Sequence, residues 1–230
     1  MAPPTLPQAL LDALAVDPAQ PLITWVSEGG QRSELSVRTF ENNVAKAANL
    51  LQDEAGAGSR VVLRLPPHWQ TAVWLGACAA VGAIAWLDGD DADPRVEAVV
   101  LGPGATASTA APLTLATSLH PFGMPFTTAL PAGVLDAAVE VRAHGDRFTA
   151  YEPPSATTPW LVDGDLEQTQ AGALDVARDL AAELGIADGA RVLLRSTRTS
   201  TDARTAVAIL ALPLATGGSV VLLTDPGADA

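Results

Sequence analysis

The chain has 230 residues, of which 48% are hydrophobic, and its formal net charge is −13 at pH 7. This apolar content excludes a disordered chain and is enough for the core of one large or two small domains. The acidic balance, with no basic stripe or cluster, excludes nucleic acids and anionic membrane surfaces as partners, because no group of cations would neutralise phosphates.

Cysteine content and apolar runs narrow the setting. Cys78 is the only cysteine and lies in an apolar stretch, so we expect it to pack as a small hydrophobic residue. The first residues show no signal-peptide pattern, and these features together predict a cytoplasmic protein. Residues 69–87 and 205–223 are uncharged and approach membrane length, but glycines divide both runs. We therefore expect a buried helix and then a buried strand in each run, with no membrane span.

The N-terminal region predicts a helix, a hairpin and a second helix. Residues 6–15 are typical of a short amphipathic helix, and residues 21–26 and 31–35 of strands joined at Glu28-Gly29-Gly30. Ser36 is a good N-cap for the helix that follows. Apolar residues recur there at spacings of three and four: Val37, Phe40, Val44, Ala47 and Leu51.

Residues 59–90 predict a strand–helix–strand unit. The apolar run 61–65 indicates a buried strand, and Pro66-Pro67 end it. Residues 69–81 indicate a helix that is buried on nearly all sides, with Gly82 as its left-handed C-terminal residue. Residues 83–87 return as a second strand. The handedness rule for such crossovers predicts that the two strands run parallel.

The same plan recurs in residues 189–225, which predict a strand at 191–195, an apolar helix, a Gly217-Gly218 stop and a strand at 219–223. Arg60-Val61-Val62-Leu63-Arg64 aligns with Arg191-Val192-Leu193-Leu194-Arg195, which favours an internal duplication. A helix near 174–184 precedes this second copy. Asp165 and Gln168 have the spacing of a capping box for that helix.

The intervening segment predicts strands at 96–101, 113–119 and 139–142, and a Pro- and Gly-rich connector over 122–158. We place the boundary there, with a first α/β half at 1–150 and a second at 151–230, packed as one unit. The predicted fold class is therefore α/β, with mainly parallel sheets built from two repeated strand–helix–strand units and helices on both sides.

Two stretches at strand ends are candidate sites, because ligands of open parallel sheets bind beyond the carboxyl ends of the strands. The loop after residue 195 offers Arg198, Ser200 and Thr201 at a helix N-terminus, as an anion site or simply as a solvated cap. His68 and Trp69 lie at the mouth of the first crossover, as a pocket mouth or as capping and packing residues. The histidines and the cysteine show no metal-ligand spacing, so no metal site is predicted.

Several of these stretches resemble adenylate-forming (AMP-binding) enzymes, the superfamily of acyl-CoA synthetases, luciferases and peptide-synthetase adenylation domains. The likeness covers most of residues 21–91 and 163–226 and implies the fold of an acyl-CoA synthetase N-terminal domain. The segments that carry it are Glu34-Leu35-Ser36, Gly58-Ser59-Arg60-Val61-Val62-Leu63, Leu65-Pro66, Gly82-Ala83, Ala171-Gly172, Ala182-Glu183-Leu184-Gly185 and Gly217-Gly218-Ser219-Val220-Val221-Leu222.

The resemblance also marks what is missing. The phosphate loop of the family reads T-S-G-T-T-G-x-P-K-G, and the matching segment here keeps only the hydroxyls of Ser155, Thr157 and Thr158. Ala156 and Pro159 stand where glycines belong, no lysine follows, and the next charged residues are acidic and would repel a triphosphate. The adenine, ribose and C-terminal catalytic-lysine motifs of the family are not found in the chain.

These features predict a truncated, non-catalytic relative that acts through ligand binding or protein assembly, with no cofactor, and that self-associates or docks on another protein. The alternative is an adenylating or nucleotide-binding subunit of a split acyl-CoA synthetase-like enzyme, with ATP, AMP or acyl-CoA as ligand. A third interpretation is a sensor that keeps such a pocket without chemistry.

Overall fold

The structure is a computed structural model that describes residues 4–106 and 111–224. Its strands are β1 (Pro21–Ser27), β2 (Arg32–Ser36), β3 (Arg60–Arg64), β4 (Ile84–Leu87), β5 (Val96–Leu101), β6 (Leu113–Ala116), β7 (Leu135–Asp136), β8 (Pro159–Asp163), β9 (Leu166–Thr169), β10 (Arg191–Ser196) and β11 (Ser219–Thr224). Its helices are α1 (Leu6–Val16), α2 (Val37–Glu54), α3 (Trp69–Val81), α4 (Ala137–Arg142), α5 (Gln170–Leu184), α6 (Ala203–Ala206), the π-helical η1 (Val207–Ala211) and α7 (Leu212–Thr216).

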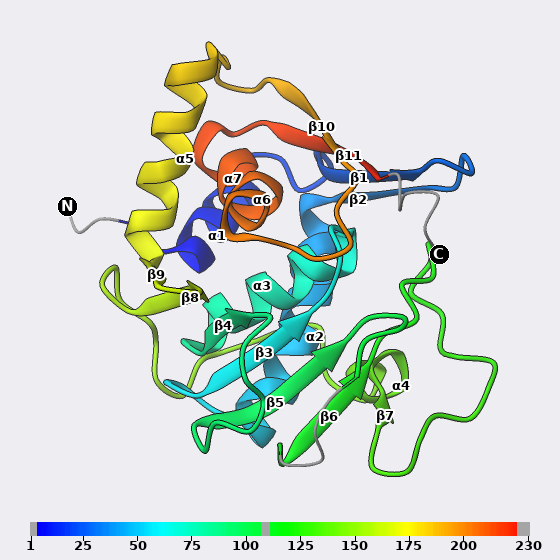
Figure 1. Ribbon diagram of the computed structural model, residues 1–230. Coiled ribbons are helices and arrows are strands. Elements are labelled where there is room, and N and C mark those ends of the chain that lie inside the picture. The colour runs from blue at the N-terminus through cyan, green and yellow to red at the C-terminus, as the bar shows by residue number, and fades with distance from the viewer. Residues whose placement is uncertain (1–3, 107–110, 225–230) are drawn as a thin grey trace.

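Two sheets organise the fold (Figure 1). The four-stranded sheet has the order β10-β11-β1-β2, and the seven-stranded sheet has the order β7-β6-β5-β3-β4-β8-β9. Neighbouring strands run parallel except within the hairpins β1–β2 and β8–β9. Helix α3 lies between the two sheets, and one continuous hydrophobic core joins them. The predicted α/β class with largely parallel sheets is confirmed.

The first strand–helix–strand unit forms as predicted. Strand β3 pairs in parallel with β4, and every residue of α3 except Gln70 is buried. His68 caps the start of the helix, and Gly82 ends it in the left-handed region at φ 81°. Cys78 is fully buried, and this burial raises the pKa of its thiol to about 12. The cysteine therefore packs as a protonated, small hydrophobic residue, as expected.

The second unit follows the same plan with an irregular helix. Strand β10 pairs in parallel with β11, and Gly217 ends α7 in the left-handed region at φ 64°. The connecting helix changes from α-helical to π-helical geometry over Val207–Ala211 and returns to α-helix at Leu212. Pro213 lies at the start of α7. Proline lacks an N–H and its ring clashes with the carbonyl four residues earlier, which accounts for the local widening.

The repeat is larger than the predicted unit. A hairpin and a helix precede each copy, namely β1, β2 and α2 before β3, and β8, β9 and α5 before β10. Each hairpin joins the sheet of the other copy, because β1 pairs with β11 and β8 pairs with β4. The order β10-β11-β1-β2 thus recurs within the larger sheet as β3-β4-β8-β9. This reciprocal exchange supports the predicted internal duplication.

Two predicted strands need correction. Residues 139–142 are not a strand but belong to α4, because Asp136 caps a helix there and accepts a hydrogen bond from the Ala138 N–H. In that helix Ala137 and Val141 lie four residues apart and both pack on the core. The strand predicted over 113–119 ends at Ala116. The chain cannot continue it through Leu119, whose backbone has a positive φ of 52°.

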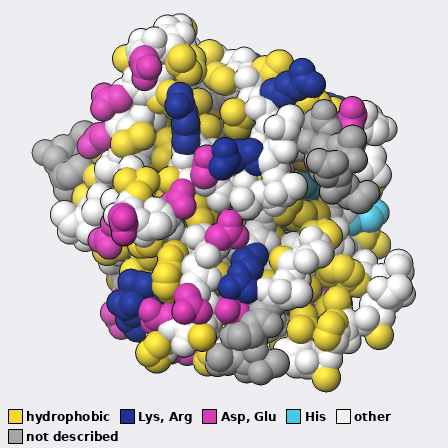
Figure 2. Space-filling model, in the orientation of Figure 1, with side chains coloured by type: hydrophobic (Ala, Val, Ile, Leu, Met, Phe, Trp, Pro, Cys, Tyr) yellow, Lys and Arg dark blue, Asp and Glu magenta, His cyan; other side chains and the backbone are white. Residues whose placement is uncertain are grey.

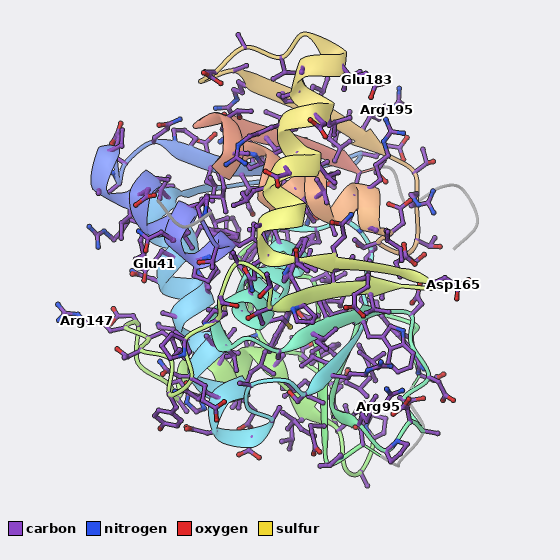
Figure 3. The ribbon with its side chains drawn as sticks, turned by 90° about the vertical axis from the view of Figure 1, so that its left-hand side faces the viewer. Glu41, Arg95, Arg147, Asp165, Glu183 and Arg195 are labelled. Carbon is purple, nitrogen blue, oxygen red and sulfur yellow. The ribbon has the colours of Figure 1, made fainter. Side chains whose placement is uncertain are left out.

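The predicted capping box before the second long helix is also wrong. Thr169 caps α5 by accepting a hydrogen bond from the Gly172 N–H at 3.1 Å. Asp165 lies instead in the turn of the β8–β9 hairpin, and Figure 3 shows it at the hairpin tip, away from the start of α5. The dipeptide Asp163-Gly164 is a hairpin signal that the interpretation of this segment overlooked.

The two sheets each contain strands from both sides of residue 150, where we placed the boundary between the halves. Strands β8 and β9 come from the second half but extend the sheet of the first, and β1 and β2 do the reverse. Residues 225–230 of the predicted second half lie outside the described part of the chain. Within residues 4–106 and 111–224, no helix has both the length and the apolar character needed to cross a membrane.

Candidate functional site

The segment that resembles a phosphate loop forms a compact turn before β8. The Ser155 hydroxyl lies 3.2 Å from the Thr157 hydroxyl and 3.1 Å from the Thr158 hydroxyl. The Ser155 N–H donates to Thr158 Oγ1 at 2.9 Å, and the Thr158 N–H donates to the Ser155 carbonyl. The structure therefore brings the three predicted residues together. Their polar groups contact one another, in a turn that is closed on itself.

This turn also lies at the N-terminus of α5. The first N–H groups of a helix have no partner within the helix and can bind a phosphate when nothing else accepts their hydrogen bonds. The Gln170 N–H donates to the Thr158 carbonyl, and the Ala171 N–H donates to the Ala156 carbonyl, both at 3.0 Å. The Gly172 N–H already donates to Thr169 Oγ1. The first three amides of the helix thus have acceptors from the chain itself. Carbonyl oxygens face the position that an anion would need.

The second candidate anion site, before α6, is closed in a similar way. The Ala203 N–H donates to Asp163 Oδ2 at 2.8 Å, and the Thr205 N–H donates to Asp202 Oδ1 at 2.9 Å. Arg198 forms an ion pair with Asp202 at 3.3 Å. Burial alone would raise the pKa of Asp202, but the hydrogen bonds from Thr205 and the charge of Arg198 hold it below its ordinary value. Two carboxylates therefore occupy this helix N-terminus.

Thr201 lies deeper than its neighbours in this loop. Its N–H donates to the Leu65 carbonyl at 2.9 Å, which joins the loop to the end of β3. Its hydroxyl is buried and has no hydrogen-bond partner among the described residues. Ser200 is only partly exposed and forms no side-chain hydrogen bond within that part of the chain. The loop is thus anchored to the first copy and does not present its three predicted residues as one cluster.

His68 is a buried capping residue, as one of its two predicted interpretations had it. Only 2% of the residue is exposed, and Nδ1 accepts a hydrogen bond from the Gln70 N–H at 3.2 Å. Its ring packs against the Trp25 and Trp69 rings, with centroids 4.5 and 5.6 Å away. Burial lowers the pKa of His68 to about 3, so the imidazole is neutral near pH 7. It is therefore a poor general acid or base there, although Nε2 has no partner among the described residues.

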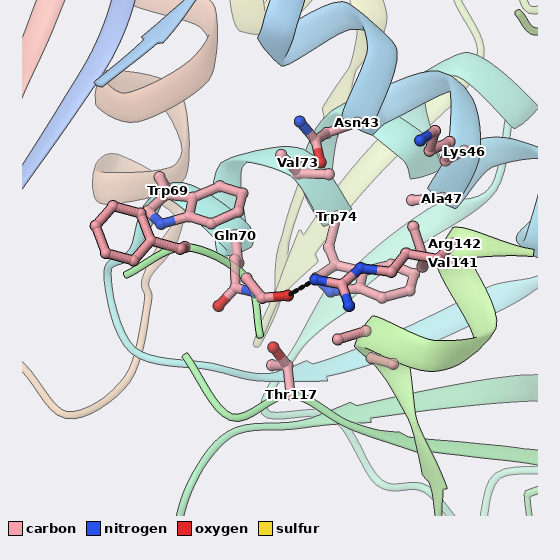
Figure 4. Close-up of a pocket in the computed structure, with 14 residues that line it drawn as sticks. Asn43, Lys46, Ala47, Trp69, Gln70, Val73, Trp74, Thr117, Val141 and Arg142 are labelled. Atoms are coloured by element: carbon pink, nitrogen blue, oxygen red, sulfur yellow. Dashed lines mark hydrogen bonds between the residues drawn. The ribbon is translucent and has the colours of Figure 1, made fainter. Parts of the chain in front are cut away.

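Trp69 does line a pocket, which lies on the first copy (Figure 4). Its walls come from α2, α3, α4 and the turn after β6, and its volume is about 170 Å³. The lining includes two basic side chains, Lys46 and Arg142, and no carboxylate. The sequence interpretation missed this site because its residues lie in four separate segments. The one local signal was Lys46, the only lysine of the chain, placed between buried alanines of the amphipathic helix α2.

Two larger cavities lie elsewhere, one of about 530 Å³ beside the turn after β5 and one of about 370 Å³ beside β10, whose lining includes Arg195, Arg198 and Arg204 with Asp202. Figure 2 shows the charges on one face of the molecule. Acidic and basic side chains are interspersed there, and no large basic area forms. Within the described residues, no group of three histidine, cysteine or acidic side chains is placed to hold a metal ion.

Comparison with known proteins places this geometry in context. No family model matches the chain. The acetoacetyl-CoA synthetase from Streptomyces lividans is similar with a TM-score of 0.73 and 22% identity, over 98% of this chain and 39% of that chain. The N-terminal domain of FACL13 from Mycobacterium tuberculosis is similar with a TM-score of 0.67 and 16% identity, over 95% of this chain and 57% of that chain.

These likenesses confirm the predicted fold, that of an acyl-CoA synthetase N-terminal domain, and the chain spans less than two thirds of both solved structures. A closer sequence match comes from Mycobacterium tuberculosis (strain ATCC 25618 / H37Rv). A "TIGR03089 family protein" from that organism is 39% identical over 239 residues, covering 97% of this chain and 91% of that protein. At this identity over nearly its whole length, the chain belongs to the TIGR03089 family.

Proposed function

We propose that this protein does not form acyl-adenylates and that it acts by binding a ligand or another protein. The observation that carries the proposal is the closed N-terminus of α5, where the Thr158 and Ala156 carbonyls and the Thr169 hydroxyl accept the first three helical amides. Adenylation requires donors and cations positioned on the triphosphate. Here acceptor oxygens occupy that place.

Charge around the turn points the same way. Glu152, Asp163 and Asp165 are the nearest charged residues in sequence on either side of the turn, and no lysine or arginine lies between residues 148 and 177. A carboxylate near the phosphates would oppose the binding of ATP by Coulomb repulsion. Opening the turn would also break hydrogen bonds that cap α5. Both costs have to be overcome before ATP could bind in this place.

Isotope exchange between pyrophosphate and ATP, with a panel of carboxylic acids, tests the absence of adenylation. We expect exchange at the level of a blank without protein, while a competent acyl-CoA synthetase run in parallel gives a clear signal. Exchange above the blank that disappears in Thr157→Ala would overturn the proposal. That result would support a nucleotide-binding subunit of a split enzyme instead.

Assembly with a second protein or a second copy is supported by the edge of the four-stranded sheet. Among the described strands, β10 has a neighbour on one side only, and Leu193 at its centre is 66% exposed. Parallel strands are usually covered on both faces, so an exposed leucine there is unusual. Light scattering should give a mass above that of one chain, and Leu193→Lys should lower it. Val16→Lys, at an exposed residue of α1, serves as the control and should leave the mass unchanged.

A further inference from the structure

The pocket lined by Trp69, hereafter the α2–α4 pocket, differs in charge balance from the chain as a whole. The chain contains 26 acidic and 13 basic residues, yet the pocket lining contains two basic residues and no acidic one. Lys46 comes from α2 and Arg142 from α4, so two separate helices each contribute one cation. Such a local excess of positive charge favours an anion in an otherwise acidic protein.

Neither cation is neutralised by a carboxylate in the described part of the chain. The Arg142 guanidinium donates to the Gly123 carbonyl at 3.0 Å, the hydrogen bond dashed in Figure 4. It also lies 3.7 Å from the Met124 sulfur, and both groups are uncharged. Lys46 forms no ion pair with a described residue. Arginine presents several N–H donors in one plane, and donors that remain after the Gly123 contact suit a carboxylate.

The other walls of the pocket combine apolar surface with single polar groups. The indoles of Trp69 and Trp74, with Val73, form much of one side. Thr117 is 98% buried, and its hydroxyl points toward the pocket in Figure 4. The buried amide oxygen of Gln70, another residue of the lining, has no hydrogen-bond partner among the described residues. Aromatic walls with few oriented polar groups are typical of small-molecule sites.

The walls of this pocket are held in place by hydrogen bonds. The Trp69 indole N–H donates to the Pro121 carbonyl at 3.1 Å, and the Gly123 N–H donates to the His120 carbonyl at 2.8 Å. Gly123 has a φ of +61°, and a Cβ there would lie 3.2 Å from the Trp69 ring. The turn is therefore fixed close against the indole, and the two together form one wall of the pocket. Little reorganisation would be needed for a ligand to enter.

We propose that the α2–α4 pocket binds a small organic carboxylate, with the carboxylate toward Arg142 and Lys46 and an apolar body against Trp69 and Trp74. The volume of about 170 Å³ limits the ligand to roughly the size of benzoate, since an engineered cavity of about 150 Å³ holds benzene. The proposal rests on the proposed function only in that the protein acts by binding. It concerns a different part of the molecule from the closed phosphate-loop turn.

Isothermal titration with benzoate, benzamide and acetate tests the proposal on the full chain. Benzoate should bind with a measurable constant, because it combines the charge and the apolar body. Benzamide lacks the charge and acetate lacks the ring, so each should bind at least about tenfold more weakly. Arg142→Gln and Lys46→Met remove one charge each and should weaken benzoate binding by roughly tenfold. Arg147→Gln is the control, because Arg147 is exposed and lies outside the pocket (Figure 3).

Circular dichroism of each variant separates lost binding from lost folding. If Arg142→Gln unfolds α4, Lys46→Met still tests the charge, because methionine keeps most of the aliphatic side chain. The proposal is overturned if benzoate does not bind at millimolar concentration, if benzamide binds as well as benzoate, or if the pocket variants bind benzoate like Arg147→Gln. Pyrophosphate exchange is measured on the same samples. If exchange occurs and benzoate still binds, the protein forms adenylates and only the proposed function is overturned. If benzoate does not bind and no exchange occurs, only the proposed carboxylate site is overturned.

Discussion

Strands β3 and β10 contain the same Arg-x-x-Leu-Arg pattern and pair in parallel with the last strand of their own unit, yet their surroundings differ. Strand β3 lies between β4 and β5, and Val62 at its centre is fully buried. Strand β10 is an edge strand, and the aligned Leu193 is 66% exposed. The helix after β3 is regular and almost wholly buried, whereas the helix after β10 contains a π-helical turn.

The difference shows that whether such a strand is central or at an edge depends more on the strands that flank its unit than on the residues of the strand itself. The first copy is followed by β5, β6 and β7, which extend the sheet beyond β3. In the described chain, no strand follows β11 to cover β10 in the same way. The same local pattern therefore forms a buried centre in one sheet and an open edge in the other.

The sharpest test substitutes the same residue at the two aligned positions. Val62→Asp would bury a carboxylate without a partner, and we expect it to lower the free energy of unfolding by more than about 4 kcal/mol. Leu193→Asp, on the open edge, should change it by no more than about 0.5 kcal/mol at protein concentrations where light scattering gives the mass of one chain. Urea unfolding followed by circular dichroism measures both. Equal losses at the two positions would mean that β10 is as well covered as β3.

The N-cap of α3, the helix of the first unit, offers a second test, through the dependence of stability on pH. His68 caps α3 with a pKa of about 3, whereas an unfolded histidine titrates near 6.5. Between these values the unfolded chain binds a proton that the folded chain does not, so stability falls as the pH drops below about 6.5. The loss should reach roughly 2 kcal/mol by pH 5, given 1.36 kcal/mol per pKa unit.

His68→Asn keeps an acceptor for the Gln70 N–H and removes the titrating ring. This variant should therefore flatten the dependence of unfolding free energy on pH between 6.5 and 5, whatever its stability at pH 7. Urea midpoints at several pH values measure the slope. His120→Asn, at an exposed histidine, is the control. An unchanged slope in His68→Asn would contradict the assignment of a buried neutral imidazole.

A third comparison uses the residue just before the last strand of each unit. Ala83 holds this place before β4, but a Cβ on the corresponding Gly218 would lie 2.2 Å from the Ala190 carbonyl oxygen. Gly218→Ala forces the backbone apart there and should cost about 1 to 3 kcal/mol in unfolding free energy. Gly145→Ala has open space around it and should cost less than about 0.5 kcal/mol. Matching losses in the two variants would show that the close approach at Gly218 is not a constraint.

Local patterns were enough to predict most elements, and they failed where the deciding contact is distant in sequence. The caps at Ser36, Gly82 and Gly217 and the buried strands could be read from neighbouring residues. The exchange of hairpins between the copies could not, because no local pattern states which strand β1 or β8 will join. Residues 139–142 were misassigned because four alternating residues are too short to outweigh the cap at Asp136.

The candidate sites show the same limit. The hydroxyl-rich loop before α6 suggested an anion site at Ser200, and the family resemblance suggested a vestigial phosphate loop at Thr157, because side-chain types indicate which groups are available. They do not indicate which groups are already paired. Asp163 caps α6 from 40 residues away, and the Ala156 carbonyl accepts a hydrogen bond from the Ala171 N–H at the start of α5. The α2–α4 pocket is likewise assembled from separate segments, so the position of its two cations in one lining becomes visible only in three dimensions.

The smallest expected effect concerns the arginine that begins β10. Arg191 donates to Glu34 of β2 at 2.9 Å, and this hydrogen bond, with one from the Thr24 hydroxyl, holds the pKa of Glu34 below its ordinary value. The contribution is present above the ordinary pKa of 4.5 and is lost as the pH falls through the lower folded value. Glu34→Gln should therefore reduce the acid sensitivity of unfolding below pH 4.5 and cost under about 1 kcal/mol at pH 7, because the pair is partly exposed. Glu183→Gln, at the exposed end of α5 (Figure 3), should leave the acid sensitivity of unfolding unchanged.

Arg60, which aligns with Arg191, has different partners. Its guanidinium lies 4.4 Å from the centroid of the Trp86 ring and 3.8 Å from Asp93. If Glu34→Gln left the acid sensitivity of unfolding unchanged, the ion pair between Arg191 and Glu34 would not stabilise the β2 edge of the four-stranded sheet. The two arginines would then differ in role as well as in partner.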